Sequence, residues 1–252
     1  MNDLKSLLRW AFYFDFGTSP ERMASHYANE LRQAPSRATV RVLSELSGCS
    51  PEQLNRSHFL ISINDFLRLY KSNIIEAGRN TGINAAVIAA VIRWEFLKNL
   101  IGRGTDDVQL FFPGQNDGIG WGSMHTQEAI SLTDERNLNR VACIRMDAVS
   151  IIPLIAQFIK NCVDEYFDAS NGIYIGNDLA VMAYFYNTGM PKVQESARRN
   201  RIYNDVSLRD NVRLNVTVNE MARWVTANHS QFIPYNTTPQ IPDLVKAYAV
   251  GF

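Results

Sequence analysis

Hydrophobic residues recur at helical spacing along most of the chain, and helix-start and helix-stop residues separate these segments. Ser-Pro-Glu triplets at residues 19–21 and 50–52 begin two of them, because serine caps a helix and proline fits its first turn. Strand patterns are almost absent, so the sequence predicts an all-α protein of about ten helices. The other expected helices lie at residues 36–47, 64–80, 85–99, 126–132, 134–146, 150–167, 178–187, 191 onward, 218–231 and 242 onward.

Residues 101–125 interrupt the helical pattern. The segment IGRGTDDVQLFFPGQNDGIGWGSMH is rich in glycine and predicts a long ordered loop, with or without a short hairpin inside it. Loops of this length are uncommon in compact domains and tend to carry function. The length of 252 residues allows one large domain or two small ones. We expect an N-terminal helical region over residues 1–80, packed on a main domain over residues 81–252.

The composition is that of an ordinary globular protein. The chain is 46% hydrophobic and 20% charged, and its 25 basic residues balance 25 acidic ones. No apolar run approaches the roughly 18 residues needed to span a bilayer. These values exclude disordered, fibrous and membrane classes, and the neutral charge argues against a nucleic-acid partner. The first 20 residues lack a small-residue cleavage site, so no signal peptide is predicted.

The cysteines and histidines point to no metal or disulfide framework. Cys49, Cys143 and Cys162 are odd in number and far apart, and the four histidines show no metal-ligand spacing. Cys143 and Cys162 fall within apolar helical patterns, where a free thiol usually packs as a small hydrophobe. We therefore expect buried structural cysteines and no metal site.

One glutamate occupies a position where the helical pattern expects an apolar residue. Glu95 continues the apolar stripe that reaches Ile92, near the C-terminal end of the expected helix at 85–99. Burial and the negative end of the helix dipole would both raise the pKa of its carboxyl, as a general acid requires. Taken alone, an ion pair with Arg93, Lys98 or a distant arginine is the commoner explanation of such a position.

Three motifs, in this order, resemble those of the lytic transglycosylase and goose-type lysozyme superfamily. The first is the helix AAVIAAVIRWEFLKN, which contains Glu95 near its end. The second is the loop GIGWGSMHTQEA at residues 118–129, and the third is the helix-closing turn YNTG at residues 186–189. The resemblance implies a lysozyme-like helical fold with Glu95 as the catalytic acid. Two positions depart from the family, since Phe96 and Ser123 stand where it usually has serine and glutamine.

The resemblance also implies a reaction, cleavage of the β-1,4 bond between N-acetylmuramic acid and N-acetylglucosamine in peptidoglycan, with no cofactor. Glu95 would protonate the glycosidic oxygen, and Asp117 would be the second catalytic carboxylate if water attacks. If Glu95 instead returns as base, the product carries a 1,6-anhydro end. The aspartates of the loop favour the hydrolytic, muramidase reaction. An Asx bond that holds the following turn explains Asp117 equally well.

The remaining expected site residues also follow from the resemblance. Tyr186 corresponds to a family tyrosine whose hydroxyl lies beside the acid, and core packing is its alternative. The substrate-binding set is Asp107, Trp121, Ser123, Met124 and Asn187. A solvated turn explains Asp107 as well, and a core position explains Trp121 as well.

Charge is unevenly distributed despite the zero sum. Residues 101–140 carry three basic against six acidic residues, whereas residues 192–213 carry six basic against three acidic. The basic segment would suit an anionic cell-wall polymer, although a solvated helical face is the more usual explanation.

A substrate outside the cytoplasm requires delivery when no signal peptide is present. We expect the chain to be made in the cytoplasm and to act in the periplasm or cell wall, either as an antibacterial effector toxin carried by a secretion system or as a phage endolysin released through a holin. An effector implies an inhibitor (immunity) protein in the producing cell. The alternatives to an enzyme are a catalytically dead peptidoglycan-binding module and a helical interaction protein.

Overall fold

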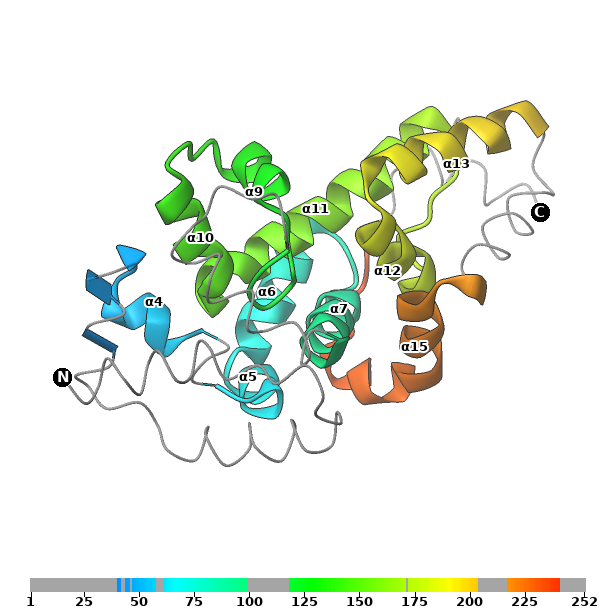
Figure 1. Ribbon diagram of the computed structural model, residues 1–252. Helices are drawn as coiled ribbons and strands as arrows, with labels where there is room; N and C mark the ends of the chain where they lie inside the picture. The colour runs from blue at the N-terminus through cyan, green and yellow to red at the C-terminus, as the bar shows by residue number, and fades with distance from the viewer. Residues whose placement is uncertain are drawn as a thin grey trace, which may run out of the picture. The chain divides into compact units, whose positions relative to one another are not determined.

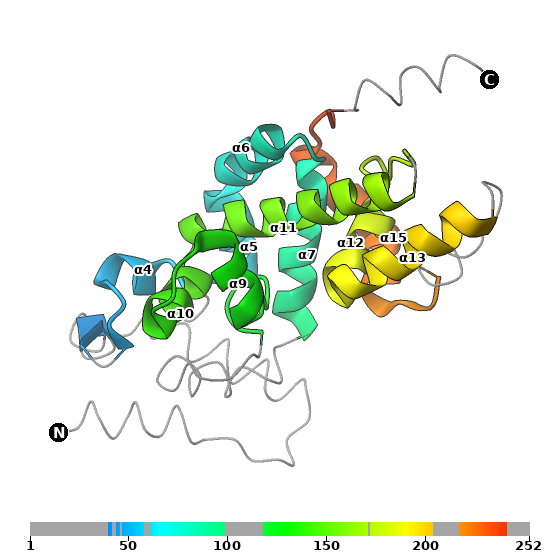
Figure 2. The same ribbon diagram turned by 90° about the horizontal axis from the view of Figure 1, so that it is seen from above.

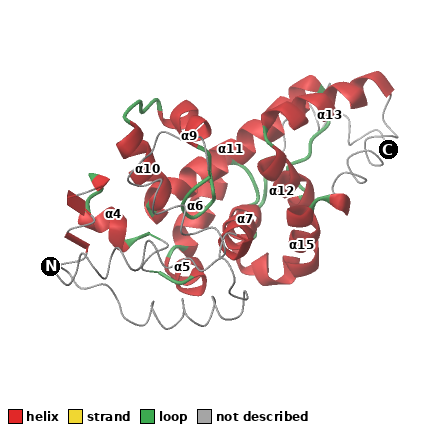
Figure 3. Cartoon of the chain, viewed as in Figure 1, coloured by secondary structure: helices red, strands yellow, loops and turns green. Residues whose placement is uncertain are grey.

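The computed structural model describes residues 40–41, 44–45, 47–57, 61–98, 118–170, 172–203 and 217–240. These residues are mostly helical and form no strand (Figure 3), which confirms the all-α class. The labelled elements are α4 (Pro51–Asn55), α5 (Ile63–Leu69), α6 (Lys71–Thr81), α7 (Ala85–Lys98), α9 (Thr126–Thr133), α10 (Leu138–Met146), α11 (Ala148–Ala169), α12 (Leu179–Thr188), α13 (Met190–Tyr203), α15 (Glu220–Asn228) and the 3₁₀ helix η1 (His229–Tyr235).

The chain divides into two compact units that do not follow the order of the sequence. The first comprises residues up to Tyr70 together with Glu95–Ile151, and the second comprises Lys71–Trp94 together with the residues from Ile152 onward. Helices α4, α5, α9 and α10 belong to the first unit, and α6, α12, α13, α15 and η1 belong to the second. The division falls within α7 and α11. The expected boundary between residues 80 and 81 stays a prediction.

Capping side chains determine where two helices of the first unit, α4 and α10, begin. Ser50 Oγ accepts a hydrogen bond from Gln53 N at 3.1 Å, and Gln53 Oε1 accepts one from Ser50 N at 3.0 Å. This reciprocal capping box begins α4 at the predicted residue. Asn137 Oδ1 likewise accepts from the first backbone amides of α10. Helices α9 and α10 are neighbours in this unit (Figure 1).

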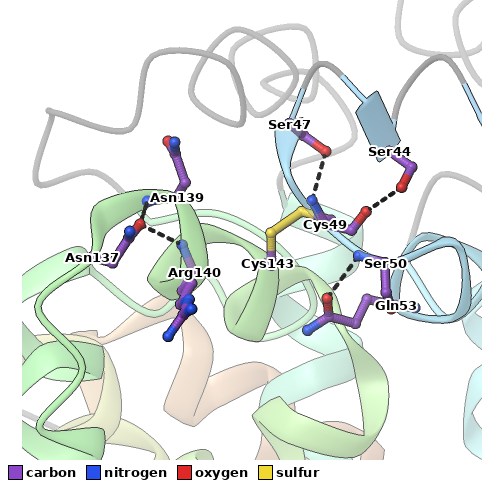
Figure 4. Close-up of a disulfide and its surroundings, with 9 residues drawn as sticks. All are labelled: Ser44, Ser47, Cys49, Ser50, Gln53, Asn137, Asn139, Arg140 and Cys143. Carbon is purple, nitrogen blue, oxygen red and sulfur yellow. Dashed lines mark hydrogen bonds between the residues drawn. A yellow bond between two sulfur atoms is a disulfide. The ribbon is translucent and has the colours of Figure 1, made fainter.

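The main correction to the sequence analysis concerns the cysteines. Cys49 and Cys143 form a disulfide across a sequence separation of 94 residues (Figure 4), so the expected absence of disulfides is wrong. Their predicted burial is confirmed, since Cys49 is 1% and Cys143 3% exposed. Cys162 is a buried free thiol as expected, and burial raises its pKa to about 12. No local pattern shows the pairing, because only the fold brings the start of α4 to α10.

Three helix boundaries also differ from the prediction. The single helix expected over residues 64–80 is two helices, α5 and α6, which are separated at Tyr70. Helix α10 begins later than expected because Asp134 has a φ of 56°, outside the helical region. Helix α11 begins earlier, so Pro153 lies inside it. The carbonyl that would pair with the missing proline N–H belongs to Val149, an exposed residue.

Helix α7 supplies the centre of the second unit. Its residues from Ala85 to Ile92 are all fully buried, which fits a helix that is apolar on every side. Helices α12 and α15 lie side by side in both views (Figures 1 and 2). The Trp224 ring of α15 contacts Trp94 at 5.6 Å and Phe232 at 5.9 Å between centroids.

A segment just after η1 holds the start of α7. Thr237 Oγ1 accepts a hydrogen bond from Ala85 N and donates one to Ile83 O, both at 2.9 Å. Asn84 Oδ1 accepts from Ala86 N at 3.0 Å and from Thr237 N at 3.2 Å. The N-terminal amides of the central helix are therefore capped partly by residues more than 150 positions away in the sequence.

Replacing Thr237 by alanine is expected to lower the free energy of unfolding by about 1 kcal/mol, because the α7 amide loses its capping acceptor. Urea denaturation measures the change. Serine at this position keeps the hydroxyl and should restore most of the stability. Alanine at the neighbouring exposed Thr238 is the matched control, and an equal loss there would show that the capping interpretation is wrong.

Candidate functional site

Glu95 lies in the last turn of α7, where the fully buried part of that helix ends. Its side chain is 8% exposed, and Phe96 beside it is 7% exposed. The predicted burial of Glu95 is confirmed, and its role as an acid stays a prediction. Buried carboxyls near a helix end occur both in catalytic sites and in structural ion-pair networks.

Residues 118–125, the described part of the glycine-rich segment, form a short, closed loop in the first unit. Ile119 and Met124 pair as an antiparallel bridge, with turn residues between them. A Cβ on Gly118 would lie 2.2 Å from the Ser123 carbonyl oxygen, and a Cβ on Gly120 would lie 2.1 Å from the Arg145 carbonyl oxygen. Both positions require glycine because the backbone approaches too closely for a side chain. The hairpin that the sequence allowed is present in the described part of the loop.

Arg145 of α10 holds the second half of this loop, at Met124 and Thr126. Sequence analysis did not predict a role for this residue. Its side chain is 1% exposed. Nε donates to the Met124 carbonyl oxygen at 2.8 Å, and Nη1 donates to Thr126 Oγ1 at 2.7 Å. A lone arginine inside the otherwise apolar stretch VACIRM was the available signal, since a buried guanidinium needs several acceptors.

Trp121 anchors the first half of the loop in the core. It is fully buried, and its Nε1 donates to the Arg56 carbonyl oxygen at 2.9 Å. Its ring contacts Phe66 at 4.1 Å and is stacked with Phe96 at 5.7 Å between centroids. The structure therefore supports the core interpretation of Trp121, because stacking on a sugar needs an exposed ring face. Phe96, the residue after Glu95, thereby contacts the loop.

Ser123 and Met124 differ in their access to solvent. Met124 is 3% exposed, so its side chain is part of the core in this structure. Ser123 is partly exposed at the turn and has a φ of 47°. Of Trp121, Ser123 and Met124, the predicted substrate contacts of the loop that the structure describes, Ser123 is thus the one with accessible surface.

An ion pair fastens α4 to the end of α10. Arg56 donates to both carboxylate oxygens of Asp147, from Nε at 2.6 Å and from Nη2 at 3.2 Å. Ser150 Oγ also donates to Asp147, at 2.6 Å. The Asp147 side chain is 2% exposed and that of Arg56 33%, and the hydrogen bond to the carboxylate raises the pKa of Arg56. This network fixes the position of Arg56, whose backbone carbonyl oxygen accepts the hydrogen bond of Trp121.

Alanine at Asp147 is expected to lower the free energy of unfolding by about 2 kcal/mol, because Arg56 and Ser150 both lose a buried acceptor. The partial exposure of Arg56 limits the loss, since water can solvate its guanidinium. Thermal or urea unfolding measures it. Alanine at the exposed Asp65 is the control, and a larger effect there than at Asp147 would contradict the assignment.

Two further predicted residues belong to the second unit. Tyr186 is half-buried near the end of α12 and meets the Phe158 ring edge-on at 5.5 Å. Asn187 is exposed, and its Oδ1 accepts a hydrogen bond from Asn219 Nδ2 at 2.9 Å. Asn219 also caps α15, so Asn187 has a structural contact in addition to its predicted role. Gly189 ends α12 with a φ of 80°, as the sequence suggested.

Asp107 and Asp117 lie outside the described residues, so their predicted roles stay predictions. Within the described ranges, no group of three or more His, Cys, Asp or Glu side chains could hold a metal ion. In the same residues no single helix is long and apolar enough to cross a membrane. The pair α10 and α11 meets the length and composition criteria only jointly, with a 93° bend between them.

The described fold and site define a mostly helical protein with a buried glutamate at the end of its central helix and a tightly held glycine-rich loop. No family model, curated protein or solved structure matches the chain. The assignment of a function therefore depends on the site and on the three sequence motifs.

Proposed function

We propose that the protein cleaves the glycan strands of peptidoglycan, with Glu95 as the general acid of a lysozyme-like domain. The observation that carries the proposal is the position of Glu95, 8% exposed in the last turn of α7. The adjoining Phe96 ring is stacked with Trp121 of the glycine-rich loop. The motif resemblance to lytic transglycosylases and goose-type lysozymes supports the same residue as the acid.

The proposed reaction begins when Glu95 donates its proton to the oxygen of the β-1,4 bond after an N-acetylmuramic acid residue. Positive charge develops at the anomeric carbon as that bond breaks. In the hydrolytic route, which we favour, a second carboxylate deprotonates an attacking water, and Asp117 is the candidate for this role. In the alternative route, Glu95 takes the proton of the muramoyl 6-hydroxyl, which closes a 1,6-anhydro ring.

Incubation of the purified protein with isolated peptidoglycan tests the proposal. Mass spectrometry of the soluble fragments separates reducing ends, expected from a muramidase, from anhydro ends, expected from a lytic transglycosylase. Equal quantities of fragments from the wild type and from Glu95→Gln would refute the assignment of the acid.

A peptidoglycan-binding module without catalysis is the second candidate. Phe96 and Ser123 favour it, because they stand where the superfamily that the motifs resemble usually has serine and glutamine. Co-sedimentation with peptidoglycan and no release of fragments would support this alternative. For either activity we propose delivery to the periplasm or cell wall. If the protein is an effector toxin, the producing cell needs an inhibitor protein.

A further inference from the structure

The contacts that hold α4 against α10 include the disulfide at one end of the helix and an ion pair at the other. Cys49 lies immediately before the helix and is bonded to Cys143. Arg56, immediately after it, is bonded to Asp147 at the end of α10. One attachment is covalent and depends on the redox state of its surroundings, whereas the other is an ion pair that does not.

The backbone around Cys49 is arranged to present the sulfur to α10. Cys49 N donates to Ser47 Oγ at 3.2 Å, and Ser44 Oγ donates to the Cys49 carbonyl oxygen at 2.6 Å (Figure 4). Gly48 has a φ of 75°, which turns the chain before the cysteine. The segment is thus fixed by short-range contacts, and the disulfide joins it to the rest of the unit.

The first half of the glycine-rich loop, residues 118–123, contacts both ends of the segment that the disulfide and the ion pair attach to α10. Ile119 packs in one cluster with both cysteines, Leu54 and Met146. Trp121 donates its indole hydrogen bond to Arg56, at the other end of α4. The second half of the loop is held differently, by the Arg145 side chain of α10, which needs no contact with α4.

We propose that the Cys49–Cys143 bond is a redox-controlled maturation step that fixes the glycine-rich loop after the chain enters an oxidising compartment. The two thiols exchange with a disulfide of glutathione or of a thiol–disulfide oxidoreductase. One sulfur–sulfur bond forms in the protein, and the partner's is cleaved. Two electrons and two protons pass to the partner, which leaves as two thiols. In a reducing cytosol the bond is absent, and α4 is held by the ion pair and by the packing of Leu54 in the apolar cluster.

The proposal does not depend on the enzymatic assignment. A thiol count tests whether the Cys49–Cys143 bond forms under oxidising conditions and is absent after reduction. Cys162 is the free cysteine, so it contributes one thiol to the count in either preparation. Protein prepared under oxidising conditions and then denatured should show one thiol per chain, and protein treated with dithiothreitol should show three. Three thiols in both samples would overturn the proposal.

Hydrogen exchange of the folded protein tests the effect on the loop. Reduction should speed exchange in residues 50–57 and 118–123 by about tenfold or more, because the disulfide no longer holds α4, which this half of the loop contacts. Exchange in α12 should stay unchanged. The double variant Cys49→Ala with Cys143→Ala should resemble the reduced wild type and should not respond to dithiothreitol.

Cys162→Ala is the matched control, since it keeps the disulfide and should respond to dithiothreitol as the wild type does. Unchanged protection of residues 118–123 in the reduced wild type would overturn the switch. This readout needs no substrate, so its failure is distinct from a failure to cleave peptidoglycan.

Discussion

Replacing Glu95 by glutamine is expected to slow peptidoglycan cleavage by a factor of about 10² to 10⁴, the usual contribution of a positioned general acid. Glutamine has nearly the same size and keeps a hydrogen-bonding end group, so the buried site retains its shape. It has no proton to give to the glycosidic oxygen at the pH of the assay. The initial rate of fragment release from isolated peptidoglycan measures the effect.

Two controls separate the loss of an acid from a loss of fold. Glu76 is exposed on α6, and its replacement by glutamine should leave the rate unchanged. The thermal unfolding midpoint of Glu95→Gln should stay within a few degrees of the wild type, because glutamine nearly conserves the volume of the buried glutamate side chain. A variant that is folded and cleaves at the wild-type rate would remove Glu95 from the mechanism.

The sequence predicted the helices best where local chemistry decides them. The apolar run of α7 gave its start at Ala85 and its end within one residue of Lys98. The Ser50 capping box began α4 as expected. Both signals are short-range, since they depend on side chains within one or two turns of the backbone they satisfy.

The missed disulfide is an error of another kind, because its two cysteines are 94 residues apart in the sequence. The carboxylate of Asp147 binds Arg56, Ser150 and the first turn of α11, so the helix begins before the predicted cap. The cap of α7 combines both kinds of contact, because Ala86 N donates to the nearby Asn84 and Ala85 N donates to the distant Thr237. Propensity and periodicity carry no information about such partners.

The same distinction between local and distant contacts applies to the candidate site. The burial of Glu95 follows from its helical register, and the glycines of the loop follow from its composition. The environment of Trp121 does not, because Phe66, Phe96 and the Arg56 carbonyl come from three separate segments. Arg145 was overlooked for the same reason. Its acceptors lie about 20 residues earlier in the chain.

Removing the disulfide should have the largest effect on stability. Replacing both Cys49 and Cys143 by alanine is expected to lower the free energy of unfolding by about 4 kcal/mol under oxidising conditions. The bond closes a loop across a separation of 94 residues, and its loss frees the unfolded chain to adopt many more conformations. Urea denaturation of the two proteins, without reductant, measures the difference.

The reduced wild type distinguishes the covalent constraint from side-chain packing. If the constraint dominates, wild type in dithiothreitol should unfold at nearly the urea concentration of the double variant, and the variant should not change. Cys162→Ala removes a buried sulfur without a bond and should cost only about 1 kcal/mol. Because both bonded cysteines belong to the first unit, the loss should appear there, with exchange in α12 and α15 of the second unit unaffected. Equal stability of the oxidised and reduced wild type would show that the bond does not constrain the chain.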